Sequence, residues 1–65
     1  MVDLERTERD IATLQESIRI ARLALTEPSL PAEDRRRWQT SIELYERHLC
    51  ELIAKRDDLR ALAED

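Results

Sequence analysis

Glu27-Pro28-Ser29-Leu30-Pro31 is the stretch of sequence that decides the fold. The residue before a proline is pushed out of α-helical geometry, and a proline itself fits a helix only in the first turn. A helix that reaches this segment from the N-terminal side must therefore end near Thr26, and the second proline is placed to begin another helix. The acidic Glu33 and Asp34 follow at once, where they face the positive end of the new helix dipole. The sequence predicts a first helix over about residues 3–26, a turn over 27–31 and a second helix over about 32–63.

On the N-terminal side of this turn, apolar residues recur with the heptad spacing of a coiled coil. Position a of the heptad holds Leu4, Ile11, Ile18 and Leu25, and position d holds Thr7, Leu14 and Ala21. Residues at these two positions form one stripe along a helix. The first helix is therefore predicted to be amphipathic, with this stripe packed against another helix.

The second predicted helix carries a matching stripe. Its position d holds Trp38, Tyr45, Leu52 and Leu59, and its position a holds Ile42, Leu49, Arg56 and Ala63. A connection of five residues favours an antiparallel hairpin. In that arrangement one register pairs an a residue with a d residue in every layer, from Leu4 with Leu59 to Leu25 with Trp38, and the two residue numbers always add up to 63. Residues 1–65 are thus predicted to form a single all-α, coiled-coil-like helical hairpin.

Thr7 and Arg56 form the one polar layer of this predicted seam. Under one interpretation the layer fixes the alignment of the helices at some cost in stability, as polar seam residues do in coiled coils. Under the other, Arg56 lies near a frayed end and its guanidinium reaches out of the seam to Asp3 or Asp10. The sequence leaves both interpretations open.

The composition of the 65 residues excludes several kinds of site. The chain contains no glycine, which excludes the Gly-rich turns that bind phosphates and dinucleotides. Cys50 is the only cysteine, and His48 with Glu51 offers at most two ligands to a metal. We expect no cofactor and no metal. Ordering so short a chain costs on the order of 100 kcal/mol of conformational entropy, so we expect association with another chain to add stability.

The charge distribution argues against nucleic acid as a partner. The net charge is −4, and 11 basic residues are interspersed with 15 acidic ones, so no extended positive field exists. Arg35-Arg36-Arg37-Trp38 alone resembles a phosphate-binding patch. However, Glu33 and Asp34 neutralise much of its charge, and Trp38 belongs to the seam. We interpret this segment as a solvated turn.

The sequence also indicates where the chain resides. No apolar run approaches the ~20 residues of a membrane span, and the chain is charged from Asp3 onward. A single cysteine suits a reducing compartment, so we expect a cytoplasmic protein without membrane contact. Ten arginines against one lysine suggest a bacterial or phage origin.

A second stripe, without charge, runs beside the seam in the half of the hairpin nearer the turn. Heptad positions c and g place its members on one side of an antiparallel hairpin. We call these residues the uncharged face: Thr13, Ser17, Ile20, Ala24, Ser41, Leu44 and His48, with Leu23 at its edge. Position e of both helices forms the opposite flank, which is mostly polar or charged: Glu8, Gln15, Arg22, Gln39, Glu46, Ile53 and Arg60.

Small and aliphatic side chains on the uncharged face allow a further helix to approach closely. We predict that the face, centred on Ile20 and Leu44, is a docking surface. Two copies joined there make a homodimeric four-helix bundle, and helices of a different protein are the alternative occupant. Single exposed aliphatic residues are also common on protein surfaces and then carry no function.

The predicted function is that of a non-catalytic interaction protein, acting as an inhibitor, adaptor or accessory subunit. A two-helix rod has no concavity that holds carboxylates away from water, so we do not expect an enzyme. In length and hairpin layout the chain is similar to the Rop family of RNA-binding four-helix bundles, which implies an RNA-binding alternative. The layout also resembles the small co-chaperones of type III secretion and, through Leu44-Tyr45-Glu46-Arg47 and the heptad, the small subunit of exonuclease VII. Those resemblances imply a subunit of a larger complex.

Overall fold

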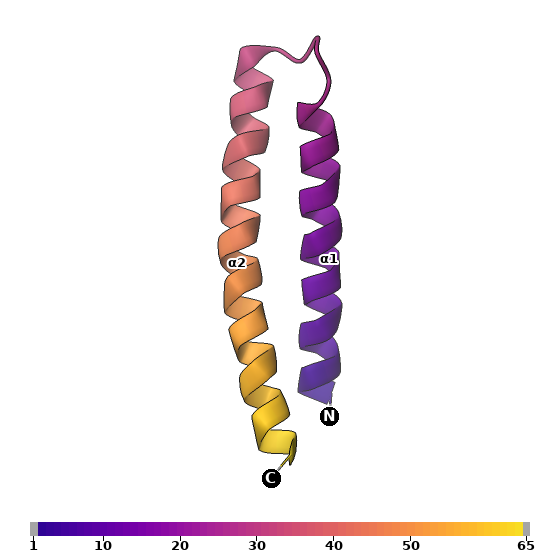
Figure 1. Cartoon of the computed structure of the whole chain (residues 1–65), viewed down its shortest axis with the longest axis vertical. Helices are drawn as coiled ribbons and strands as arrows, with labels where there is room; N and C mark the ends of the chain where they lie inside the picture. Colours follow the sequence, from indigo (N-terminus) through magenta and orange to yellow (C-terminus); the bar gives the residue numbers. More distant parts are fainter. Residues whose placement is uncertain (1, 65) are drawn as a thin grey trace.

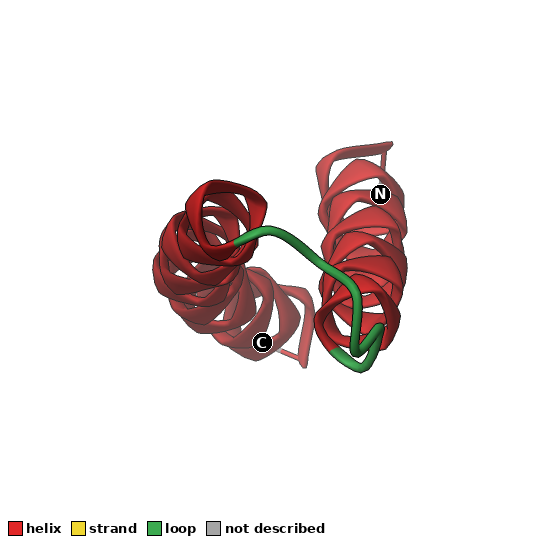
Figure 2. Cartoon of the chain, turned by 90° about the horizontal axis from the view of Figure 1, so that it is seen from above, coloured by secondary structure: helices red, strands yellow, loops and turns green. Residues whose placement is uncertain are grey.

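The computed structural model describes residues 2–64 and shows an all-α helical hairpin (Figure 1). Helix α1 spans Val2–Leu25 and helix α2 spans Ala32–Glu64, and the two pack against each other along their length. The first helix begins and ends one residue earlier than expected, and the second continues one residue further. The molecule is a rod with extents of 52 × 14 × 13 Å. Viewed from above, the helices are inclined to each other and a single loop joins them (Figure 2).

Backbone and side-chain hydrogen bonds hold the turn between the helices. At the end of α1, the amide of Thr26 donates to the carbonyl of Leu23 at 3.1 Å, which tightens the last turn. The guanidinium of Arg35 reaches back from α2 and donates to the carbonyl of Leu25 at 3.1 Å. The carbonyl of Pro31 accepts the amide of Arg35 at 2.9 Å and so starts the hydrogen-bond ladder of α2. The prolines thus stop one helix and start the next, as their chemistry requires.

The seam between the helices forms the core. Thr7, Ile11, Ile18 and Ala21 are buried, and each occupies position a or d of α1. The seam residues of α2 from Trp38 to Leu59 are all half-buried. These seam residues of α2 therefore keep part of their surface in water. The heptad pattern correctly predicts which side of each helix faces the other.

Two ion pairs between the helices report their register. Arg22 contacts Glu46 at 2.9 Å, and Glu8 contacts Arg60 at 2.8 Å. From the first pair to the second, the residue number falls by fourteen in α1 and rises by fourteen in α2. The helices are therefore antiparallel and keep one register over two heptads.

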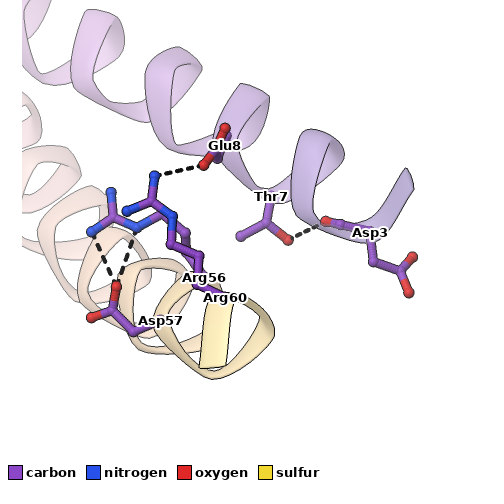
Figure 3. Close-up of polar contacts among 6 residues, drawn as sticks. All are labelled: Asp3, Thr7, Glu8, Arg56, Asp57 and Arg60. Atoms are coloured by element: carbon purple, nitrogen blue, oxygen red, sulfur yellow. Dashed lines mark hydrogen bonds and ion pairs between the residues drawn. The ribbon is translucent and has the colours of Figure 1, made fainter. Parts of the chain in front are cut away.

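The polar layer near the open end is satisfied by local bonds (Figure 3). The buried hydroxyl of Thr7 donates to the backbone carbonyl of Asp3 at 2.7 Å. The half-buried Arg56 pairs with its neighbour Asp57 at 3.3 Å, and not with Asp3 or Asp10. Each polar member of the layer thus finds its partner on its own helix, which keeps the cost of burying it low.

The hairpin exposes more surface than a compact protein of its mass. Its radius of gyration is 15.2 Å, against about 11 Å for a compact chain of this length. The accessible surface is 5190 Å², whereas a compact 7.7 kDa protein exposes about 4,300 Å². The excess of about 900 Å² is surface that a two-helix rod cannot cover by itself.

Candidate functional site

The residues of the uncharged face lie at two depths. Ser17, Ala24 and Ser41 border the seam and are half-buried, whereas Thr13 and His48 are exposed. The two aliphatic residues at the centre of the face are Ile20, which is 50% exposed, and Leu44, which is 57% exposed. The seam therefore leaves two large apolar side chains on this side of the hairpin in contact with water.

The hydroxyl groups on the α1 part of this face are already engaged. Thr13 donates its hydroxyl to the carbonyl of Arg9 at 3.1 Å, and Ser17 donates to the carbonyl of Thr13 at 3.0 Å. A serine or threonine hydroxyl bonded to its own helix needs no second acceptor. The α1 part of the face can therefore be covered by apolar groups without leaving a donor unpaired.

The two sides of the hairpin differ in how the helices are joined. Both interhelical ion pairs, Arg22 with Glu46 and Glu8 with Arg60, join residues of the opposite flank. Within residues 2–64, no ion pair connects the helices on the side of the uncharged face. On one side of the seam, charged side chains of the two helices thus pair with each other. On the side of the uncharged face, the described residues form no such pair.

Leu23 has different neighbours from the rest of the uncharged face. It is 57% exposed and lines a shallow groove on the side of α1 that carries the opposite flank, with Gln15, Ile18, Arg19, Arg22 and Thr26. Ile20 and Leu23 are three residues apart and so remain neighbours on the helix surface. Leu23 therefore lies on the outer shoulder of α1, away from α2.

One exposed apolar residue on the side of the uncharged face was not predicted to belong to it. Leu62 is 67% exposed, more than Ile20 or Leu44. It occupies position g of α2, the same heptad position as Ser41 and His48, so the helical period was a sufficient signal to find it. It lies near the open end of the hairpin, beyond the stretch on which we centred the face.

A groove on the opposite flank is the second surface with apolar content. It has a volume of about 450 Å³ and contains the half-buried Ile53 and the exposed thiol of Cys50. Its full lining is Gln15, Ile18, Arg22, Glu46, Leu49, Cys50 and Ile53. The ion pair between Arg22 and Glu46 lies within this lining, so an incoming helix must displace or desolvate it.

The arginine-rich segment at the start of α2 is engaged within the chain. Arg35 donates to the carbonyl of Leu25, and Arg37 pairs with Glu33 at 3.5 Å. Trp38 is half-buried. Two of the three arginines thus already have a partner within the chain, and the segment lies inside α2 and not in the turn between the helices.

Among the described residues, Glu16 and Arg19 form a pair whose pKa values are both shifted. Arg19 donates a hydrogen bond to Glu16 and lowers the pKa of that exposed carboxylate, while the same contact raises the pKa of Arg19. Both groups are solvated, and their pairing is an ordinary surface contact. Among the described residues, no group of three or more His, Cys, Asp or Glu side chains is placed to hold a metal ion. Neither α1 nor α2 is long and apolar enough to cross a membrane.

Comparison with protein-family models, with curated proteins and with solved structures finds no match to this chain. The function is therefore inferred from the surface of the hairpin alone. Of the two candidate surfaces, the uncharged face has the more exposed apolar side chains and no interhelical ion pair among the described residues. We take it as the candidate functional site.

Proposed function

We propose that this protein is a non-catalytic interaction module that binds helices of a protein partner through the uncharged face. The observation that carries the proposal is the exposure of Ile20 and Leu44 on the side of the seam where the described residues form no interhelical ion pair. Apolar side chains that stay in water cost about 25 cal/mol for each Å² that association would cover. In this role the chain acts as an inhibitor, adaptor or accessory subunit in the cytoplasm.

The exposed area of the rod supports this role. Association of a second helical surface along the hairpin covers part of the excess area and reduces the exposure of the α2 seam. Four-helix bundles bury their seam residues in this way, with two hairpins contributing two helices each. The ion pairs formed by Arg19, Arg22, Arg37, Arg56 and Arg60 count against the alternative of an RNA-binding bundle.

Substitution of Leu44 by Asp is expected to abolish capture of protein partners, including a second copy of the chain. A carboxylate at the centre of the face loses its hydration when a helix covers it, which costs several kcal/mol. An untagged copy of the chain is added both to the tagged chain and to tagged Leu44→Asp. The proteins that each tagged protein retains are identified by mass spectrometry, and the two sets are compared.

The matched control is Ala54→Asp, which adds the same charge to the same helix at an exposed position on its outer side. We expect Ala54→Asp to retain every protein that the unaltered chain retains. Equal retention by Leu44→Asp and the unaltered chain, or equal loss by both variants, contradicts the proposal.

A further inference from the structure

We propose that the uncharged face binds a second copy of this chain, with both turns at the same end and α1 of each copy against α2 of the other. This inference rests on the proposed function and specifies its partner. It follows from three observations: the area a stable dimer needs, the distribution of charge beyond the uncharged face, and the register of the hairpin.

The uncharged face alone is too small for a stable dimer. Thr13 to Ala24 cover about 18 Å of α1 at 1.5 Å per residue. With the 14 Å width of the rod, this gives about 250 Å² per copy, against about 800 Å² per partner in a standard interface. The whole broad side of the rod, 52 × 14 Å, gives about 700 Å² per copy. A second copy must therefore also cover the charged half of the same side, nearer the open end.

The charges in that half decide which orientation is favourable. A two-fold axis along the rod keeps every residue at its own height, so α1 faces α2 of the second copy in the register already present in the hairpin. In the register predicted for the seam, residues at equal height have numbers that add up to 63. On this side, the facing c and g residues have numbers that add up to 64 or 65, so each pair lies within about 3 Å of equal height.

The facing pairs of this arrangement match in character. Both charged pairs join opposite charges, Arg6 with Asp58 and Asp10 with Lys55. At the centre, Ile20 faces Leu44 of the second copy, so the two exposed apolar residues cover each other. No remaining pair joins two charged side chains. Two of these pairs contain one charged residue, Asp3 with Leu62 and Thr13 with Glu51, and two contain none, Ser17 with His48 and Ala24 with Ser41.

The arrangement with the turns at opposite ends fails the same comparison. A two-fold axis across the middle of the rod places α1 against α1 and α2 against α2 of the second copy. When position c is again compared with position c, Ile20 lies between Arg6 and Thr13, and Leu44 faces Glu51. Each central apolar residue then lies opposite or beside a charged one, which costs desolvation without an opposite charge in return. Charge complementarity thus favours the dimer with both turns together.

Disulfide trapping between two single-cysteine proteins tests this orientation. Both proteins carry Cys50→Ser, one also carries Ala24→Cys and the other Ser41→Cys. In the proposed dimer these positions face each other across the interface, and a disulfide needs Cα atoms about 4.4–6.8 Å apart. After mixing and mild oxidation, we expect the mixed disulfide to exceed each homodisulfide at least about tenfold, against about twofold for random pairing. The pair Ala12→Cys and Ala54→Cys, on the outer sides of the helices, should give the random ratio.

The light-scattering mass of the Cys50→Ser protein is measured first, so that the possible failures are distinguished. A dimer that gives mainly the Ala24→Cys or Ser41→Cys homodisulfide, or no disulfide, overturns the orientation and leaves self-association intact. A protein that stays at 7.7 kDa at every concentration overturns the second copy as the occupant. The proposed function is then still tested by the capture experiment with Leu44→Asp. That experiment also detects binding of proteins other than a second copy of the chain.

Discussion

A protein that carries both Ile20→Asp and Leu44→Asp is expected to remain monomeric at concentrations at which the unaltered chain is a dimer. In the proposed dimer, each introduced carboxylate faces another one on the second copy. Like charges brought together in an interface cost several kcal/mol, and the loss of two apolar side chains adds about 1.5–3 kcal/mol for each one that was fully buried. The dissociation constant should therefore rise by more than about a thousandfold. Sedimentation equilibrium of both proteins measures it.

The same double variant should keep its hairpin. Both positions are exposed, and an aspartate inside a helix costs only about 0.7 kcal/mol of helix propensity. The control with Ala12→Asp and Ala54→Asp adds equal charge at exposed positions outside the uncharged face. It should dimerise about as tightly as the unaltered chain. Unchanged dimerisation of the Ile20→Asp, Leu44→Asp protein would exclude the uncharged face as the docking surface.

Ile18→Asp is expected to unfold the hairpin. Ile18 is only 6% exposed and lies in the middle of the seam, where a carboxylate loses most of its hydration. An unpaired buried charge costs about 3–5 kcal/mol, and the core of a chain this short supplies at most about 3–5 kcal/mol of stability. Circular dichroism should therefore show a loss of most of the helical signal. Ile18→Val, which removes one methylene, should lower the free energy of unfolding by only about 0.5–1.5 kcal/mol.

Ala12→Asp is the control for this substitution, because it places the same charge on an exposed position of the same helix. It should unfold at a urea concentration close to that of the unaltered chain. If Ile18→Asp also unfolds at that concentration, Ile18 does not lie in the core and the seam has been assigned to the wrong residues.

The hairpin and its seam could be predicted from the sequence because both depend on backbone rules and on a fixed period. Pro28 and Pro31 interrupt the helix between the two heptad stripes. The residues of the two stripes can be paired in a single antiparallel register. The buried residues Ile11, Ile18 and Ala21 all occupy predicted seam positions. Periodicity gives the direction of each side chain from its helix, and in a pair of helices that direction determines burial.

The polar contacts could not be predicted in the same way, because long side chains adopt several rotamers at similar cost. The sequence offered Asp3 or Asp10 as the partner of Arg56, whereas the structure pairs it with Asp57. The contact of Arg35 with the carbonyl of Leu25 depends on the path of the turn, which no period describes. Leu62 could have been found, because position g was already part of the uncharged face.

The mass of the unaltered chain in solution tests the central claim, that the uncharged face is covered by a second copy. Light scattering on a sizing column, at several loading concentrations, measures it directly. We predict a mass that approaches twice 7.7 kDa as the concentration rises. A mass of 7.7 kDa at every concentration would contradict the claim, because Ile20 and Leu44 would then remain exposed in the isolated protein.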